Sequence, residues 1–303
     1  MLQTPLDIYN SYHYNILADF LKGVFEMLGI IDVGGGLRGI YGAGVFDYCL
    51  ENGIEFDYCC GVSAGSANLC SFIAHQKKRN YRSYMIYAFR KEYMSLRNFL
   101  RTGSYLDLDY VFGTLCVHDG EDPMDYETFS SFDRPFYTVA TDAETGKVKY
   151  FDIKDYKYDD FAPVKCSSCV PVVNRPYPLN GRLYYDGGLS DPIPVKKAFA
   201  DGCDKVAVIL TRPKNYYRSP SKDMKAALLI KKKYPGAAEA LSNRSRTYNQ
   251  SLDLALMEEK RGRVLILAPD NIEGLNTLTR DRSKLEELYQ KGLKDAEKLK
   301  EFI

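Results

Sequence analysis

Short apolar runs alternate along most of the chain with segments whose apolar residues recur at helical spacing. Such runs are typical of buried parallel strands, and recurrence every three or four residues is typical of helices. Strands are expected at Leu28–Val33, Phe56–Cys60, Phe136–Thr141, Val148–Phe151, Leu183–Tyr185, Lys205–Thr211 and Arg263–Ala268. Helices are expected at Ile40–Gly53, from Ala67 to about His75, at the start of Ala162–Val173, and around residues 223–233, 237–261 and 281–300. The alternation predicts an α/β fold with a mainly parallel central sheet and a helical C-terminal portion.

Composition and charge narrow the function classes. The 303 residues are 45% hydrophobic and 27% charged, which is ordinary for a globular protein. Lys and Arg total 41 and Asp and Glu total 40, a formal net charge of +1. This balance gives no overall positive potential that would attract nucleic acid or an anionic membrane, so we expect no nucleic-acid partner. The sequence also contains no apolar run long enough to span a bilayer.

The eight cysteines lie mostly inside apolar segments, where they are more easily interpreted as small buried hydrophobes than as disulfide partners. Residues 1–27 lack a basic leader and a small-residue cleavage site. Together these features predict a cytoplasmic protein. Two interpretations of residues 1–27 stay open: an ordinary N-terminal helix, or an extension of the gene model with the natural start at Met27. The expected division is then a core portion at 28–213 and a C-terminal helical portion at 214–303, packed on the same domain and containing one further strand.

Gly61-Val62-Ser63-Ala64-Gly65 is a G-x-S-x-G sequence between an expected strand and an expected helix. A nucleophilic serine at such a strand-to-helix turn needs small neighbours, because side chains on either side would collide with nearby backbone. The following helix directs its positive end at the developing alkoxide. The pattern occurs by chance in many proteins, and the strand–turn–helix setting gives it weight. It marks Ser63 as a candidate nucleophile, with Gly61 and Gly65 as the glycines of the turn.

A second candidate is the segment Gly34-Gly35-Gly36-Leu37-Arg38-Gly39, directly after the first expected strand. Consecutive glycines let backbone amides converge on an oxyanion, and Arg38 adds a positive charge nearby. The same residues also spell the G-x-G-x-x-G fingerprint of dinucleotide-binding proteins. That alternative needs an acidic residue at the end of the next strand, whereas Asp57 falls near its middle. It also leaves the Ser63 turn unexplained, so it ranks below the oxyanion interpretation.

The number and positions of the histidines narrow the choice of a general base for Ser63. The chain has His13, His75 and His118, and none follows Asp186, so the serine–acid–histidine order of the α/β hydrolases is excluded with this acid. His75 lies about three turns along the helix from Ser63, and His118 lies in a loop-like segment. Asp186 is followed by Gly187 and Gly188, which would let this aspartate approach another backbone closely. We therefore expect a direct Ser63–Asp186 pair.

GGGLRG, GVSAG and DGG, in this order, resemble the patatin-like phospholipases, and the chain looks like their bacterial branch. The resemblance covers roughly residues 28–213. It implies a three-layer α/β/α fold, Ser63 as nucleophile, Asp186 as base, and an oxyanion hole from the amides of Gly34, Gly35 and Gly36 with Arg38 as auxiliary charge. One departure is that the family's aspartate directly before the glycines is Val33 here, with Asp32 one residue earlier.

What the resemblance implies about activity is hydrolysis of lipid acyl esters through an acyl-serine intermediate, as in phospholipase A, lysophospholipase or esterase reactions, with no metal or other cofactor. The partners would be the lipid substrate and, peripherally, a membrane surface; the oligomeric state is left open. Two other classes stay as alternatives: a nucleotide-binding protein using the GGGLRG turn, and a catalytically silent lipid-binding module. Cys166 and Cys169 form a C-x-x-C pair without the second pair or histidines of a metal site, so we interpret them as small packing residues. Redox chemistry at this pair stays as a minor alternative.

Overall fold

The computed structural model describes residues 26–303, so most of the predicted segment 1–27, with His13, lies outside the described part. The strands form one eight-stranded sheet in the order β5-β6-β3-β2-β1-β7-β8, with β4 pairing beside β3. The strand bounds are β1 Leu28–Asp32, β2 Tyr58–Val62, β3 Phe136–Asp142, β4 Val148–Phe151, β5 Tyr177–Leu179, β6 Arg182–Asp186, β7 Lys205–Ile209 and β8 Val264–Leu267. The five strands from β3 to β8 in this order are parallel, whereas β4, β5 and β6 are antiparallel, which confirms the expected mainly parallel sheet.

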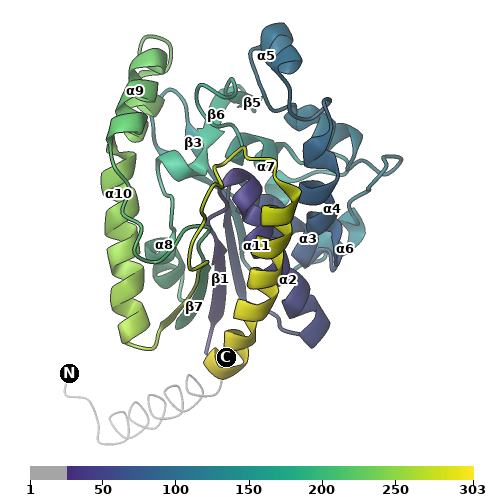
Figure 1. Cartoon of the computed structure of the whole chain (residues 1–303), viewed down its shortest axis with the longest axis vertical. Coiled ribbons are helices and arrows are strands. Elements are labelled where there is room, and N and C mark those ends of the chain that lie inside the picture. Colours follow the sequence, from purple (N-terminus) through teal and green to yellow (C-terminus); the bar gives the residue numbers. More distant parts are fainter. Residues whose placement is uncertain (1–25) are drawn as a thin grey trace, which may run out of the picture.

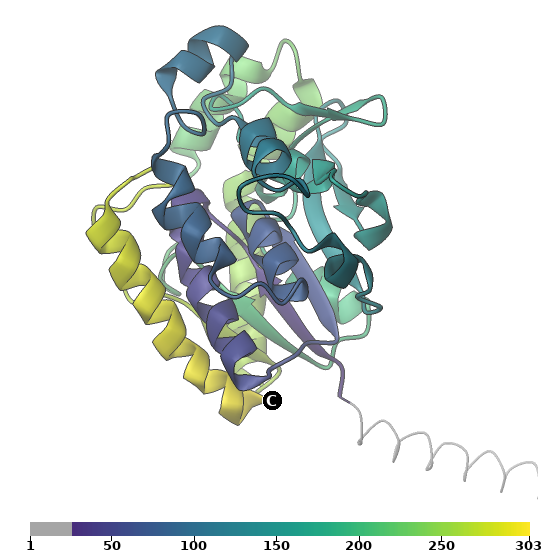
Figure 2. The same ribbon diagram turned by 90° about the vertical axis from the view of Figure 1, so that its right-hand side faces the viewer.

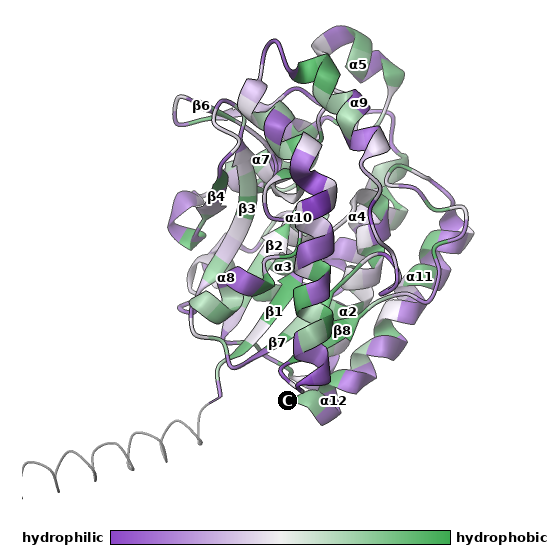
Figure 3. Cartoon of the chain, turned by 90° about the vertical axis from the view of Figure 1, so that its left-hand side faces the viewer, coloured by the Kyte–Doolittle hydropathy of each residue, from purple (hydrophilic) through white to green (hydrophobic). Residues whose placement is uncertain are grey.

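Helices cover both faces of the sheet (Figures 1, 2 and 3). Because strand residues alternate between faces, Ile30 and Ile31 of β1 enter two different cores. The first core lies against α2, α3 and α11, and the second against α8 and α10. The helix bounds are α2 Ile40–Asn52, α3 Ala64–Ile73, α4 Arg79–Met85, α5 Leu96–Thr102, α6 Tyr126–Ser130, α7 Ala162–Ser167, α8 Val195–Ala200, α9 Ser221–Ile230, α10 Pro235–Lys260, α11 Arg282–Asp295 and α12 Leu299–Phe302.

The sequence patterns located most elements and misplaced some boundaries. Helix α2 ends at Asn52 and Gly53 takes the left-handed conformation with φ 63°, as the Asn-Gly pair predicts. The second strand was expected at Phe56–Cys60 but runs to Val62, and α3 begins at Ala64 rather than Ala67. The connection at the serine is therefore a single residue. The short elements β5, α5, α6 and α8 had no periodic signal of their own.

The C-terminal residues pack closely on the rest of the molecule. Helix α11 lies along α2, and α10 crosses the opposite face of the sheet (Figure 1). All eight cysteines are free and buried, as the apolar settings predicted. Within residues 26–303, none of the helices combines the length and apolar character needed to cross a bilayer.

Candidate active site

Ser63 occupies a strained position between β2 and α3, with φ 57° and ψ −130°. A non-glycine residue in such a conformation costs about 1–3 kcal/mol and persists only where its surroundings enforce it. The flanking glycines are sterically required. A Cβ atom at Gly61 would lie 2.5 Å from the Cα of Ser66, and one at Gly65 would overlap the carbonyl oxygen of Asp32. The G-x-S-x-G spacing therefore has a direct packing reason.

The backbone of Ser63 is held by a side chain that the sequence did not single out. The Ser63 amide donates a hydrogen bond of 2.8 Å to Oγ of Ser167, at the end of α7. The Ser167 hydroxyl in turn donates to the carbonyl oxygen of Val139 in β3, at 2.5 Å, and lies 3.1 Å from Oγ of Ser66. Ser167 thus fixes the turn at Ser63 to the neighbouring strand and helix.

Asp186 is the last residue of β6, and its side chain is buried. Its Oδ1 accepts a hydrogen bond of 2.8 Å from the amide of Gly188, while its own amide donates to the carbonyl of Cys169 at 2.8 Å. The hydroxyl of Thr141 donates to the Asp186 carbonyl at 2.9 Å. Gly187 is required here because a Cβ atom would overlap the carbonyl of Val139. The carboxylate is therefore fixed in place before any ligand binds.

The pKa of Asp186 is raised, because burial disfavours its charged form. Arg244 opposes this effect most strongly, followed by the side chain of Ser63. Ser63 and Asp186 are thus brought together, although 123 positions of sequence separate them. The largest arginine effect on this pKa comes from Arg244 in α10, whose Nε donates to the carbonyl of Gly188 at 2.6 Å.

The Gly-rich segment lies directly against the Ser63 turn. A Cβ atom at Gly34, where φ is 63°, would overlap the carbonyl of Val62 and lie 2.7 Å from the amide of Gly65. The Gly34 amide donates to Oδ1 of Asp32 at 2.8 Å. Asp32 is fully buried, and burial raises its pKa to about 6. The amide of Gly34 is therefore engaged inside the loop, in contrast to its expected role as an oxyanion donor.

The next two glycines differ from Gly34 in this respect. Within residues 26–303, the amides of Gly35, Gly36 and Ala64 have no hydrogen-bond acceptor in the protein. Gly36 and Ala64 line the same cavity as Ser63. A Cβ atom at Gly36 would overlap the carbonyl of Thr277, which also accepts the Leu37 amide at 2.9 Å. Thr277, from the C-terminal part of the chain, thus holds the Gly-rich loop, while the amides of Gly35, Gly36 and Ala64 stay available to a ligand.

Arg38 is buried and links this loop to two other segments. Its Nε donates to the carbonyl of Thr211, after β7, at 3.1 Å, and its Nη1 lies 3.4 Å from Oγ1 of Thr277. Burial lowers its pKa to about 10, and Arg212 adds to that effect. These contacts give Arg38 a role in positioning the loop.

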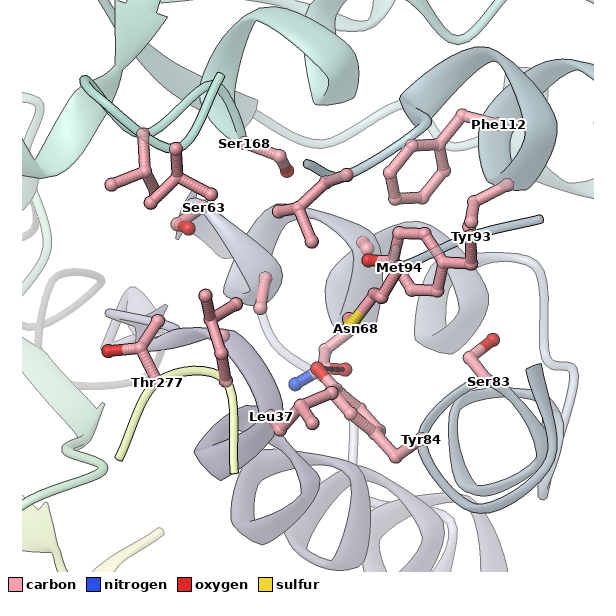
Figure 4. Close-up of a pocket in the computed structure, with 18 of the residues that line it drawn as sticks. Leu37, Ser63, Asn68, Ser83, Tyr84, Tyr93, Met94, Phe112, Ser168 and Thr277 are labelled. Atoms are coloured by element: carbon pink, nitrogen blue, oxygen red, sulfur yellow. Dashed lines mark hydrogen bonds between the residues drawn. The ribbon is translucent and has the colours of Figure 1, made fainter. Parts of the chain in front are cut away.

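A largely apolar cavity of about 420 Å³ opens beside Ser63. Figure 4 shows Ser63 and Ser168 at one side of it and the rings of Tyr93 and Phe112 at the other. Helices from both halves of the chain form its walls, including α4, α9 and α10. Its volume falls in the range of about 300–1,000 Å³ that is usual for small-molecule sites. The cavity can hold an apolar chain whose end reaches the serine.

The histidines and the C-x-x-C cysteines do not form a second reactive site among the described residues. His75 is exposed, and His118 is exposed with Nδ1 2.5 Å from Oδ2 of Asp159. Cys166 and Cys169 are buried free thiols whose pKa values are raised by burial, so both are expected to be unreactive. Among residues 26–303 there is no group of His, Cys, Asp or Glu side chains arranged to hold a metal ion.

With this fold and this arrangement of motifs, the chain belongs to the patatin-like phospholipase family, whose sequence model matches residues 33–199. A second model, for a domain of unknown function, DUF6363, matches residues 234–302. The chain is similar to the uncharacterized protein YjjU of Escherichia coli K12, with 32% identity over 198 residues, which is 64% of this chain and 54% of that protein. It thus spans about half the length of this curated relative.

Among solved structures, the chain is similar to VipD from Legionella pneumophila, with a TM-score of 0.47 and 12% sequence identity. That similarity covers 91% of this chain and 67% of the VipD chain. Membership of the family supports a lipid acyl hydrolase as the general class of activity.

Proposed function

We propose that this protein is a serine acyl hydrolase that cleaves lipid acyl esters with Ser63 as nucleophile and Asp186 as base. The observation that carries the proposal is that the strained Ser63, beside an apolar cavity, lies near enough to the buried, pre-positioned Asp186 for its side chain to lower the pKa of that carboxyl. A raised pKa makes an aspartate a better proton acceptor than an exposed carboxylate, whose pKa is about 3.9. The strained conformation of Ser63 presents its hydroxyl to the cavity.

The proposed reaction has two steps. Oγ of Ser63 attacks the ester carbonyl carbon while its proton passes to Asp186, and the tetrahedral intermediate then expels the alcohol, which takes that proton. In the second step Asp186 removes a proton from water, which attacks the acyl-serine and releases the free acid. Ser63 recovers its proton from Asp186, so the enzyme returns to its starting state.

For the oxyanion we propose the amides of Gly35 and Gly36, joined by that of Ala64. These amides have no acceptor within residues 26–303, and in strand–turn–helix serine hydrolases the amide after the nucleophile is a usual donor. Helix α3 begins at Ala64 and adds its positive end. Each well-placed donor contributes about 3 kcal/mol to stabilising the transition state.

The substrate class follows from the cavity and the family. An apolar space of about 420 Å³ beside the nucleophile suits the acyl chain of a phospholipid, a lysophospholipid or a simpler ester. Eight buried free cysteines favour a reducing compartment, and we propose the cytoplasm. The dinucleotide alternative loses support because Gly34 packs on the Ser63 turn and Gly36 packs on Thr277, which leaves little room for a pyrophosphate over the glycines.

The proposal is tested by labelling the protein with a fluorescent fluorophosphonate and locating the adduct by peptide mass spectrometry. We expect stoichiometric labelling on the peptide that contains Ser63, because the probe reacts with activated serines. Ser168→Ala is the matched control, since Ser168 lines the same cavity and has no part in the proposed machinery. An adduct on any other serine, or no adduct in a folded protein, would contradict the assignment. Lipid binding without labelling would favour the silent lipid-binding module.

Arg244 is expected to act as a positioning residue through Asp186. Since its charge lowers the Asp186 pKa, Arg244→Gln should shift the acid limb of the kcat/KM profile to higher pH. The direction follows because only ionised Asp186 can accept the proton. Arg244→Lys retains the charge and should shift the limb less. Arg246→Gln, an exposed arginine on the same helix, is the control. If Arg244→Gln lowers activity equally at every pH and does not shift the acid limb of the kcat/KM profile, Arg244 has only a structural role.

A further inference from the structure

Two exposed apolar helices lie at the same end of the molecule, α5 and α9 (Figures 1 and 3). In α5, Leu96 is 72% exposed and Leu100 is 86% exposed. In α9, Leu228 and Leu229 are 72% and 73% exposed. Single exposed leucines are common on protein surfaces, but a cluster of this kind marks an interaction site. We call α5, α9 and Val172, which is also exposed, the apolar rim.

The apolar rim is continuous with the cavity beside Ser63. Met94 and Leu106 pair as an isolated β-bridge and both line the cavity, so α5 is the segment that projects outward between them. On the other side, Asp223 and Ala226 of α9 line the cavity, while Leu228 and Leu229 point outward from the same helix. A molecule that covers the rim therefore also covers the entrance to the proposed active site.

The charges on the rim have one dominant sign. Helix α9 carries Lys222 and Lys225, and Lys231–Lys233 follow directly; all five are exposed. The acidic residue of α9, Asp223, is buried and paired with Arg218 at 2.7 Å. The exposed charges of α5 are two arginines, Arg97 and Arg101, of which Arg101 lies 3.9 Å from Asp107. The near-neutral net charge of the chain thus conceals a local excess of positive charge.

We propose that the apolar rim docks on the surface of a bilayer that contains anionic phospholipids. Leucines that enter the acyl–headgroup boundary, flanked by lysines and arginines that contact phosphates, are the combination by which helices bind such surfaces. A second copy of the chain is the less suitable occupant, because two rims of the same positive sign repel. The inference deepens the proposed function, since a rim on the membrane would let a lipid enter the cavity directly.

The test uses the full chain carrying Ser63→Ala, so that vesicles are not consumed during the measurement. Co-sedimentation is measured with vesicles of phosphatidylcholine mixed with phosphatidylglycerol, and with vesicles of phosphatidylcholine alone. The double variant Leu228→Gln, Leu229→Gln keeps good helix formers in α9. Met257→Gln is the matched control, because Met257 is an exposed apolar residue on α10, outside the rim.

We expect binding to the mixed vesicles that weakens with salt, and a drop of at least about tenfold in partitioning for the double leucine variant. Met257→Gln should bind as the parent does. With Ser63 restored, the double variant should lose hydrolysis of vesicle lipid but keep hydrolysis of a soluble short-chain ester, which separates failure of docking from failure of the proposed function. Equal binding by all variants, absence of vesicle binding, or self-association abolished by the leucine changes without vesicle binding would overturn the proposal.

Discussion

Replacing Ser63 by alanine is expected to lower kcat for ester hydrolysis by about four to six orders of magnitude, because no acyl-enzyme can form without its Oγ. The loss should appear in kcat rather than in binding, since the cavity walls are unchanged. Steady-state hydrolysis of a soluble p-nitrophenyl ester measures the effect. The fold should persist, because the Ser63 amide keeps its hydrogen bond to Ser167 in the alanine variant.

Ser168→Ala provides the comparison for this experiment. It removes a hydroxyl from the same cavity without touching the proposed machinery, so its kcat should stay near the parent value. Substantial turnover by Ser63→Ala, with the control also active, would mean that the nucleophile lies elsewhere.

Asp186→Asn is expected to reduce kcat by about 10³–10⁴-fold, because an amide cannot accept the proton from Ser63. The side-chain oxygen of asparagine can still accept from the Gly188 amide, so local structure should be retained. In the parent enzyme, activity should fall as the pH is lowered through the raised pKa of Asp186, because protonation removes the base. The variant should lose this acid limb, which pH–rate profiles from the soluble ester would detect.

The matched control is Asp191→Asn. The partly buried Asp191 carboxylate accepts a hydrogen bond from the Tyr150 hydroxyl at 2.5 Å, and burial raises the pKa of this carboxyl as well. Thermal unfolding of both variants separates loss of stability from loss of chemistry. Full hydrolysis by Asp186→Asn would remove this residue from the mechanism, whatever the control does.

The sequence predicted the parts of the fold and site that depend on local pattern. Glycines at 61, 65 and 187 were expected to permit close backbone approach, and each would place a Cβ atom against backbone. The strand pattern correctly predicted a mainly parallel sheet. It placed the end of the second strand at Cys60, whereas β2 extends to Val62 because the buried residues continue to the serine turn. A mainly apolar run does not itself reveal where pairing stops.

The contacts that the sequence could not predict join distant segments. Arg244 is one of several arginines on a long helix, and nothing in its neighbourhood marks it as a partner of the Gly188 carbonyl. Ser167 lies inside the C-x-x-C segment, whose cysteines were interpreted as packing residues, and its hydroxyl accepts the Ser63 amide. Asp32 occupies the Gly34 amide, which only the loop geometry could reveal. Such roles depend on how elements meet in space and leave no periodicity in the chain.

The contact between Thr277 and the Gly-rich loop has a practical consequence for anyone shortening this protein. The two family models match residues 33–199 and 234–302, so the first region could be chosen for expression alone. Such a fragment would lose the acceptor of the Leu37 amide, a partner of Arg38 and the arginine beside Asp186. We therefore expect a fragment that ends before Thr277 to lose the support of the Gly-rich loop, and an active fragment to extend beyond this residue.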